Sequence, residues 1–242
     1  MISNLREDSH QQNTNETRFL ELIDRLRSAE TQFGREPESV SLVAVSKTQD
    51  SANIRDVAAL HQKDFGENQI QEALRKITDL SDINCVWHFI GSIQTNKCRD
   101  IAAHFDWVHS VDRLKIAQRL SNLRSSRSQP LNIFLQVNVQ NESTKSGIAP
   151  NQLIDLANAV SKLPNLYLRG LMIVPKLESD FNQQRKIFRE VKQLQIGLNQ
   201  QLNLKLDCLS MGMTKDLEAA VAEGATHIRI GTAIFGPRDF SR

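Results

Sequence analysis

The sequence predicts an α/β protein folded as a single (β/α)8 barrel, and three observations lead to that prediction. Eight short runs rich in aliphatic and β-branched residues follow one another, each alternating with a stretch of helical periodicity. The length of 242 residues suits one barrel with few insertions. No segment rich in Pro, Gly or Ser divides the chain. An open doubly wound sheet is the main alternative, although the short second strand and the closing eighth strand count against it.

The chain begins with a polar stretch that leads into an amphipathic helix. Residues 1–15 are rich in Asn, Gln, Ser and charged side chains, so we expect them to form a disordered extension. From Thr17 to Phe33, apolar residues recur at helical spacing. The single barrel domain is therefore expected to cover residues 16–242.

The eight predicted strands are mostly apolar on both faces, as is usual for parallel strands covered by helices. We expect them at residues 40–47, 64–67, 86–90, 107–111, 132–139, 168–174, 207–211 and 226–230. Helices are expected between them, near residues 54–61, 70–77, 96–103, 114–123, 153–163, 181–200 and 217–222. Gly224 follows the last helix at a position that suits a helix C-cap.

Composition and charge limit the classes of function. The net charge is +2, and no dense basic run is interleaved with aromatic residues, so we expect no nucleic-acid surface. The three cysteines are widely separated and show no metal-binding spacing, which indicates a reducing compartment and no metal site. No signal peptide and no apolar stretch long enough to span a membrane is present, so we expect a cytoplasmic protein.

Lys47 ends the first predicted strand, and the carboxyl ends of the strands are where barrel enzymes keep their active sites. An amine held in a partly dry site loses its proton more easily and becomes a nucleophile toward aldehydes. A lysine that merely extends its charged end into water is the alternative, and position alone leaves both interpretations open.

The ends of strands seven and eight predict an anion site. Their sequences are Ser-Met-Gly-Met-Thr at 210–214 and Arg-Ile-Gly-Thr at 229–232. Barrels of this kind often bind phosphate with the loops that follow these two strands. The glycines allow backbone N–H groups to approach an anion, and the hydroxyl side chains offer further donors. Ordinary turn glycines beside a threonine N-cap are the alternative.

A nucleophilic lysine combined with a phosphate site points to a phosphorylated aldehyde, and pyridoxal 5′-phosphate (PLP) meets both demands. Arg229 lies two residues before Gly231 and on the same face of the strand, from which it could reach the pyridine nitrogen. A guanidinium stays protonated and only donates hydrogen bonds, so it would leave that nitrogen unprotonated. Such a ring is a weaker electron sink than one paired with a carboxylate.

Several segments together carry a resemblance to a known family. They are 42–47 (LVAVSK), 65–68 (FGEN), 87–91 (WHFIG), 94–97 (QTNK), 143–147 (STKSG), 169–172 (RGLM), 211–213 (MGM) and 229–236 (RIGTAIFG). On these residues the chain resembles the pyridoxal phosphate homeostasis protein family, single-barrel relatives of the alanine racemase N-terminal domain and thus of fold type III PLP proteins. Ser92 stands where the family pattern often has Pro, which affects only the expected shape of that loop.

The resemblance implies a PLP site with a Schiff base at Lys47, phosphate contacts near strands seven and eight, and a ring-nitrogen contact from Arg229. The complete set of implied cofactor-binding residues is Lys47, Asn68, His88, Met172, Ser210, Met211, Gly212, Arg229, Gly231 and Thr232. A hydrogen-bonded core histidine is the alternative for His88. Lys145 is either a second aldehyde-reactive amine or a solvated loop residue.

Two functions compete. The first is a non-catalytic PLP-binding protein that acts in intracellular vitamin B6 homeostasis, and the second is a PLP-dependent amino-acid racemase. Related two-domain racemases use a tyrosine from a partner's second domain as the second base. Here the single tyrosine, Tyr167, begins strand six, and a strand of about seven residues spans roughly 23 Å.

Tyr167 is therefore expected at the end of the barrel opposite Lys47, where it cannot serve as that base. An open mouth would also leave the cofactor in contact with water, which weakens stabilisation of a carbanion. We expect a monomeric carrier rather than an enzyme. Its partners would be PLP and either apo forms of PLP enzymes or a regulatory protein, with no nucleic acid and no membrane.

Overall fold

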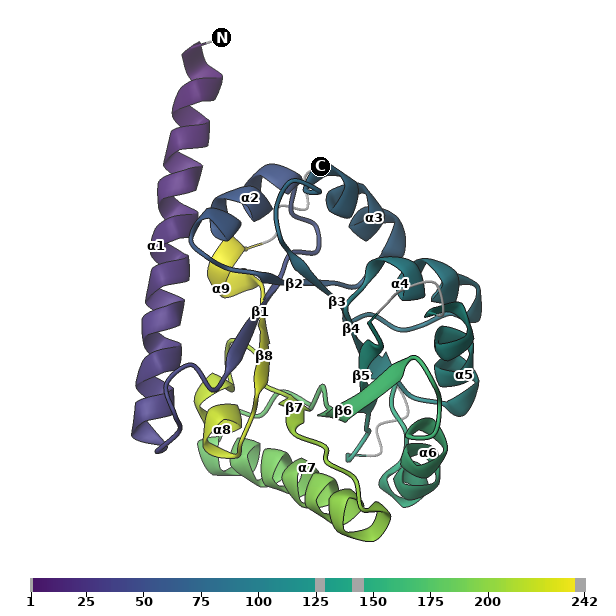
Figure 1. The fold of residues 1–242 in the computed structure, drawn as a ribbon. Coiled ribbons are helices and arrows are strands. Elements are labelled where there is room, and N and C mark those ends of the chain that lie inside the picture. Colours follow the sequence, from purple (N-terminus) through teal and green to yellow (C-terminus); the bar gives the residue numbers. More distant parts are fainter. Residues whose placement is uncertain (1, 125–128, 141–145, 238–242) are drawn as a thin grey trace.

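A computed structural model describes residues 2–124, 129–140 and 146–237, with the side chains of the first helix described from Thr14 onward. In this part of the chain, parallel strands close into a barrel in the order β1 to β8 (Figure 1). The strands are β1 (Ser41–Val45), β2 (Asp64–Glu67), β3 (Val86–Phe89), β4 (Trp107–Val111), β5 (Leu131–Gln136), β6 (Leu166–Met172), β7 (Cys208–Ser210) and β8 (His227–Ile230). The predicted (β/α)8 barrel is therefore confirmed.

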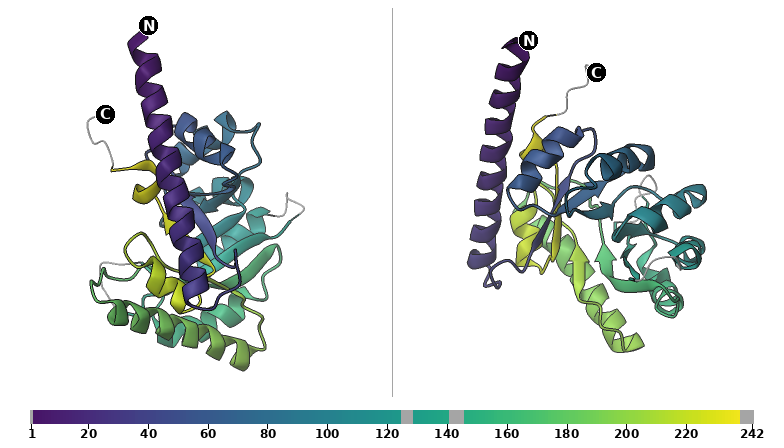
Figure 2. Two further views of the ribbon diagram at one scale, coloured as in Figure 1. Left: turned by 90° about the vertical axis from the view of Figure 1, so that its left-hand side faces the viewer. Right: turned by 45° about the horizontal axis from the view of Figure 1, so that its top comes forward.

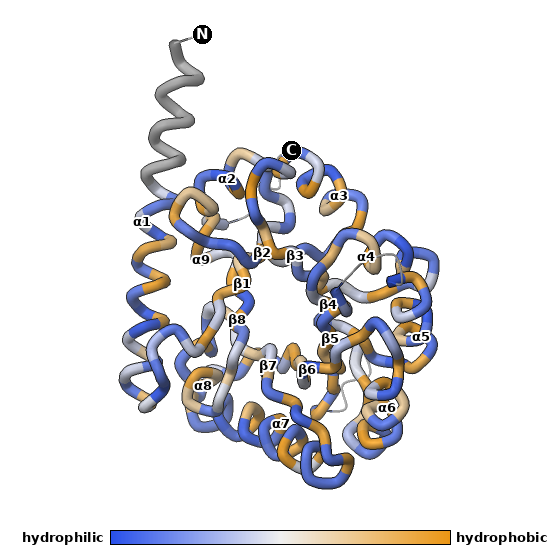
Figure 3. The backbone as a smooth tube through the Cα atoms, in the orientation of Figure 1, coloured by the Kyte–Doolittle hydropathy of each residue, from blue (hydrophilic) through white to orange (hydrophobic). Residues whose placement is uncertain are grey.

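Helices surround the strands on the outside of the barrel (Figure 1). They are α1 (Ile2–Gln32), α2 (Ser51–Ala59), α3 (Ile70–Asp79), α4 (Cys98–His104), α5 (Leu114–Leu123), α6 (Leu153–Val160), α7 (Phe181–Leu202), α8 (Leu217–Ala222) and α9 (Thr232–Phe235), with short 3-10 turns η1 (Thr95–Lys97) and η3 (Pro150–Gln152). Figure 3 shows hydrophobic and hydrophilic residues alternating along these helices, as expected when one face packs against a sheet.

Local sequence explains where the two best-capped helices begin. The carboxylates of Asp50 and Asp180 accept hydrogen bonds from the backbone N–H groups of Asn53 and Gln183, and so cap α2 and α7. The helix α7 ends at Leu202. Its C-cap residue, Asn203, adopts the left-handed conformation that Asn tolerates better than most residues.

The barrel has two interiors of different character. Between the sheet and the helices lies a large apolar core, to which β1 contributes Leu42 and Ala44. Inside the barrel, a small apolar cluster of Phe134, Met172 and Cys208 packs beside Trp107. Buried polar side chains share this inner space, and among them are three histidines and Arg229. A polar interior needs internal hydrogen-bond partners, and these partners shape the site described below.

The N-terminal segment differs from the prediction. The helix α1 begins at Ile2, whereas the sequence pattern placed its start at Thr17 after a disordered stretch. Extending an existing helix costs little because each added residue gains a backbone hydrogen bond. Figure 2 shows α1 running along the barrel and projecting past it. The described helices include none that is long and apolar enough to cross a membrane.

The sharpest steric constraint on the sheet lies at Gly170 in β6. A Cβ atom at this position would stand 1.8 Å from the carbonyl oxygen of Cys208 in β7. The atom that this Cβ would meet belongs to the backbone of Cys208, and backbone cannot move aside as a flexible side chain can. The pairing of β5 with β6 also shifts its register beside this residue, between Ile133 and Phe134.

Replacing Gly170 with Ala should therefore lower the free energy of unfolding by about 1–3 kcal/mol or more, because the strands must separate locally. Chemical denaturation followed by circular dichroism measures this change. The control is Gly197→Ala in α7, where the nearest atom to the added Cβ is the Gln201 side-chain nitrogen at 3.8 Å. That variant should gain up to about 1 kcal/mol from helix propensity. Equal stability of the two variants would contradict the prediction.

Candidate functional site

A cavity of about 530 Å³ opens at the carboxyl end of the barrel strands. Its volume lies within the range of about 300–1,000 Å³ that is usual for small-molecule sites. The lining residues come from most of the strand ends: Val45, Lys47, Gln49, Asn68, Ile90, Gly91, Ser92, Gln136, Ser146, Met172, Val174, Met213, Thr214, Arg229, Gly231, Thr232, Phe235 and Gly236. Ser92, Val174 and Thr232 are exposed, so the cavity is in contact with solvent.

The structure brings six of the ten predicted site residues together in this cavity. They are Lys47, Asn68, Met172, Arg229, Gly231 and Thr232. The other four, His88, Ser210, Met211 and Gly212, do not line it. Each of these four lies behind the cavity wall, and each has a different reason for being there.

Lys47 lies in a tight turn just after β1, with its side chain half-buried and lining the cavity. Thr48, the next residue, has φ 66°, a left-handed conformation that a β-branched residue rarely adopts. Two hydrogen bonds with α3 hold this turn. The carbonyl of Ser46 accepts a hydrogen bond from Lys76 Nζ at 2.7 Å, and the N–H of Thr48 donates to Glu72 Oε1 at 2.5 Å. The residues on both sides of Lys47 are thus fixed from α3.

The same contacts belong to a buried cluster of charges. Lys76 Nζ lies 2.8 Å from Glu67 Oε1 and 2.6 Å from Glu72 Oε1, and the side chains of Lys76 and Glu67 are 5% and 0% exposed. The hydroxyl of Ser46 donates to Glu67 Oε1 at 2.6 Å. Burial raises the pKa of Glu67, although Lys76 opposes this shift. One cluster therefore combines a structural ion pair with the positioning of the Lys47 turn.

Arg229 brings a buried positive charge to the cavity from β8, the strand that pairs with β1. Its Nη1 donates to Ser210 Oγ at 2.6 Å, and its Nη2 donates to the carbonyl of Ile173 at 2.8 Å. Burial lowers the pKa of Arg229 to about 10, and the charge of Asp216 opposes this shift. The guanidinium therefore stays protonated near neutral pH. It has five N–H donors, so donors beyond these two bonds remain for a ligand.

Gly231 and Thr232 line the cavity where β8 leads into the short helix α9. A Cβ at Gly231 would lie 2.9 Å from the carbonyl oxygen of Val45, so the backbone of β1 and β8 can meet here only with a glycine. This close approach leaves the main chain at residue 231 accessible from the cavity. An anion can reach backbone N–H groups more closely where no side chain intervenes.

Ser210, Met211 and Gly212 support the cavity from behind. The hydroxyl of Ser210 is fully buried and engaged with Arg229. Met211 belongs to the outer apolar core. Gly212 has φ 98°, and a Cβ there would lie 2.6 Å from the Cβ of Ala220 in α8. Ser210 and Gly212 hold Arg229, Gly212 also closes the packing between β7 and α8, and none of the three residues lines the cavity.

His88 is a hydrogen-bonded core histidine, which was the alternative to a direct cofactor contact. It is fully buried inside the barrel, with Nε2 2.9 Å from Asp64 Oδ1 and Nδ1 2.9 Å from His109 Nε2. A histidine on an apolar strand can point toward the barrel axis at any depth. The sequence pattern gives the direction of the side chain but not its distance from the cavity.

Sequence reasoning did not assign several residues that line the cavity. Gln136, at the end of β5, donates through Nε2 to the carbonyl of Ser146 at 2.9 Å and so fastens the following loop to the barrel. A polar residue at the end of an apolar strand was the available signal for it. Phe235 and Gly236 were missed because the four-residue helix α9 has no detectable periodicity.

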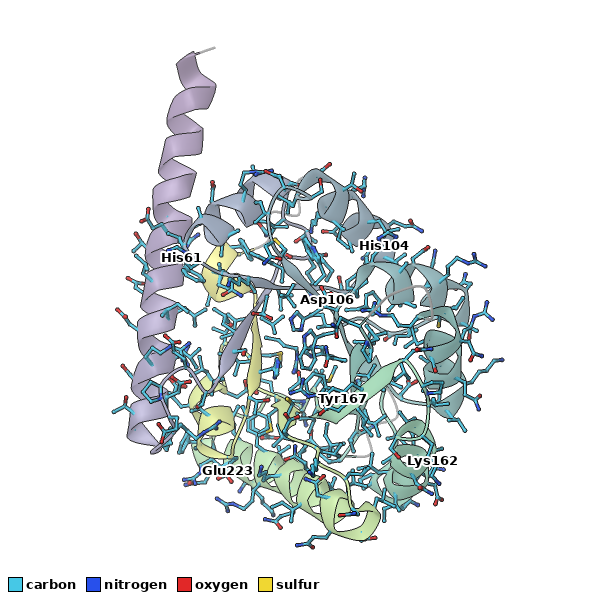
Figure 4. All side chains as sticks on the ribbon, viewed as in Figure 1. His61, His104, Asp106, Lys162, Tyr167 and Glu223 are labelled. Carbon is cyan, nitrogen blue, oxygen red and sulfur yellow. The ribbon has the colours of Figure 1, made fainter. Side chains whose placement is uncertain are left out.

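The positions of the other candidate residues are also clear. Tyr167 is 53% exposed and pairs with Asn132 at the start of β6, whereas Met172, at the other end of that strand, lines the cavity. The prediction that Tyr167 lies opposite Lys47 is confirmed. Figure 4 labels Tyr167 with other residues that precede or begin strands. Lys145 lies outside the described residues. Lys176, a lysine in the loop after β6, does not line the cavity.

The chain is similar to several known proteins. Residues 19–239 match the model of the alanine racemase N-terminal domain family. The pyridoxal phosphate homeostasis protein of Pseudomonas aeruginosa is 55% identical over 216 residues, which cover 89% of this chain and 92% of the relative. The protein of the same description from Escherichia coli K12 is 45% identical over 222 residues, covering 90% and 94%.

Solved structures extend the comparison. PipY from Synechococcus elongatus PCC7942 with PLP bound has a TM-score of 0.79 and 38% identity, covering 88% of this chain and 99% of that chain. The crystal structure of an unknown protein from Bifidobacterium adolescentis has a TM-score of 0.85 and 30% identity, covering 93% of this chain and 96% of that chain. D-threonine aldolase from Filomicrobium marinum is 14% identical with a TM-score of 0.70, which shows a shared fold alone.

The cluster behind Lys47 generates a prediction about stability. Replacing Lys76 with Met keeps the side-chain volume but leaves the carboxylates of Glu67 and Glu72 without their cation. Breaking a buried ion pair in this way should cost about 3–5 kcal/mol of unfolding free energy, measured by chemical denaturation. The control is Arg55→Met, which removes the exposed ion pair to Asp82 and should leave stability close to wild type. Similar losses in both variants would show that burial does not matter here.

Proposed function

Because the chain belongs to the pyridoxal phosphate homeostasis protein family, whose barrel is of the alanine racemase N-terminal type, we propose that it binds PLP in this cavity and serves PLP homeostasis. One observation carries the proposal: Lys47 and Arg229, which come from the two ends of the barrel sequence, line the same cavity. The aldehyde of PLP needs the amine of Lys47 to form a Schiff base. The ring nitrogen needs a hydrogen-bond donor, which the guanidinium of Arg229 supplies.

The residues present fit this cofactor. The cavity has room for a molecule of that size, and its lining offers an amine, a buried cation and a glycine backbone. We assign the covalent bond to Lys47, the ring-nitrogen contact to Arg229, and the phosphate contacts to Gly231 and Thr232. Asn68 and Met172 form walls of the cavity. When bound, PLP supplies a reactive aldehyde and a ring able to accept electrons.

We further propose that the protein holds PLP without turning over amino acids. Among the lining residues that the structure describes, Lys47 and Arg229 are the ionisable side chains, so no second base faces the cavity from them. Arg229 stays charged, because its pKa of about 10 lies well above neutral pH. A permanent donor opposite the ring nitrogen keeps that nitrogen unprotonated, which limits the ring as an electron sink.

The protein partners form the finer part of the proposal. The carrier acts as a monomer and passes PLP to apo forms of PLP enzymes, or presents it to a regulatory protein. Exposed residues at the mouth, Ser92, Val174 and Thr232, support release because water can reach the bound ligand there. Racemisation is the alternative function, and it would require a second base that the described lining does not contain.

Replacing Lys47 with Ala should abolish covalent PLP binding while leaving the barrel folded, since the side chain lies in a turn beyond β1. Borohydride reduction of PLP-loaded protein followed by peptide mapping should label Lys47 in the wild type and give no label in the variant. Lys176→Ala, a lysine outside the cavity lining, is the matched control and should label as the wild type does. A label found mainly on Lys145 or Lys176 would refute the assignment.

PLP-loaded protein should show no racemase, transaminase or decarboxylase turnover with common amino acids. The test incubates it with L-amino acids in deuterated water and follows loss of the α-proton signal by NMR, with a PLP-dependent racemase as positive control. Exchange at about 1–10³ per second, the ordinary range for enzymes, would favour the racemase alternative. Absence of exchange together with transfer of PLP to an apo-enzyme would support the carrier.

A further inference from the structure

A continuous series of hydrogen bonds crosses the inside of the barrel, from the cavity to the opposite end. Arg229 Nη1 donates to Ser210 Oγ at 2.6 Å, and this oxygen lies 2.7 Å from His109 Nδ1. His109 Nε2 lies 2.9 Å from His88 Nδ1, and His88 Nε2 lies 2.9 Å from Asp64 Oδ1. The five residues come from β8, β7, β4, β3 and β2 in turn. We call them the Asp64–Arg229 series.

The two ends of the series select one direction for all of its hydrogen bonds. A carboxylate only accepts and a guanidinium only donates. Asp64 therefore requires a proton on His88 Nε2. With one proton on each ring, His88 Nδ1 then accepts from His109 Nε2–H, and His109 Nδ1 accepts from the hydroxyl of Ser210. The lone pairs of that hydroxyl are left to accept from Arg229, as the 2.6 Å contact requires.

Burial keeps the middle of the series in this state. His88, His109 and Ser210 are each 0% exposed. Burial, the neighbouring histidines and Arg229 lower the pKa of His109 well below its usual value, so that ring is neutral. The Trp107 ring stacks on His88 with centroids 5.6 Å apart, and the Phe134 ring lies 4.5 Å from His109. Apolar rings of this kind offer no replacement for a lost hydrogen bond.

Further charged and titratable groups border the series. His227 lies beside His88 and His109 with ring centroids 6.2 and 6.1 Å away, and burial lowers its pKa to about 3. The guanidinium of Arg169 lies over the Trp107 ring and pairs with Asp207. His227 therefore adds no positive charge near neutral pH, and Asp64 is the carboxylate bonded within the series. Its side chain is 31% exposed, at the end of the barrel away from the cavity.

We propose that the Asp64–Arg229 series positions the guanidinium of Arg229 for its ligand, so that PLP binding depends on a carboxylate at the far end of the barrel. The inference rests on the proposed function, in which Arg229 meets the ring nitrogen. Ser210 and the carbonyl of Ile173 hold two N–H groups of the guanidinium and so fix its plane. Asp64, His88, His109 and Ser210 are positioning residues and touch no ligand themselves.

Loss of the acceptor at Asp64 should disturb the other end of the series, at Ser210 and Arg229. The His88 proton would be free to move to Nδ1, which would reverse both histidines and turn a His109 N–H toward Ser210. The hydroxyl would then face two donors, and its own hydrogen would compete for the space in front of Arg229. The guanidinium would lose a fixed acceptor although no atom near the cavity had been replaced.

The experiment compares Asp64→Leu with Asp64→Asn, because the amide oxygen of Asn can still accept from His88. PLP affinity and the absorbance maximum of bound PLP are measured by spectroscopic titration. Asp64→Leu should bind PLP about threefold to tenfold more weakly, with a shifted band, as expected for one weakened hydrogen bond. Asp64→Asn should restore wild-type behaviour. Asp207→Leu, which removes another carboxylate at the same end, is the control and should change neither readout.

Two outcomes would overturn the inference while leaving the proposed function intact: unchanged affinity and spectrum in Asp64→Leu, or equal losses in the Leu and Asn variants. A wild-type protein that binds no PLP would instead refute the proposed function and the positioning role with it. If Asp64→Leu fails to fold, ¹⁵N NMR of the wild-type histidines gives the decision. Protons on Nε2 of both His88 and His109 are expected, and a proton on Nδ1 of either ring would overturn the series.

Discussion

A guanidinium buried inside a barrel is costly unless its N–H groups find acceptors, and Arg229 imposes this requirement on its surroundings. The hydroxyl of Ser210 and the carbonyl of Ile173 meet it directly. Ser210 Oγ in turn lies 2.7 Å from His109 Nδ1. Hydrogen-bond contacts continue from His109 through His88 to Asp64. The buried positive charge at the cavity is thus linked to the polar interior of the barrel.

Closure of the barrel brings the two ionisable side chains of the described cavity lining together. β1 pairs with β8, with Val43 opposite Arg229 and Ala44 opposite Ile230. Lys47 follows β1 near the start of the domain, and Arg229 lies on β8 near its end, so neither could reach the other in an open sheet with a different strand order. Gly231 permits the final approach, since any side chain there would meet the backbone of Val45. The fold and the site therefore depend on the same pairing.

The sequence predicted the barrel well because strand and helix periodicities, and the order of elements, are local properties of the chain. It also predicted which strand ends meet, and Lys47, Arg229 and Gly231 do line one cavity. Depth along the barrel axis was harder to predict. Alternation along a strand gives the inward direction of Ser210 or His88 but not which hydrogen-bond partner it finds. Gly212 serves packing against Ala220, a contact across two elements that no local pattern reveals.

On the proposed function, the same features that would suit the site to holding PLP would also make it a poor catalyst. A protonated arginine placed at the ring nitrogen would strengthen binding and weaken the ring as an electron sink. Exposed residues at the mouth admit water, which favours release of an aldehyde ligand and opposes stabilisation of a carbanion. On this proposal, turnover of amino acids would require a second base over the cavity and shelter from water. Replacing Arg229 alone would not suffice, because the series behind it would be left without the donor that sets its direction.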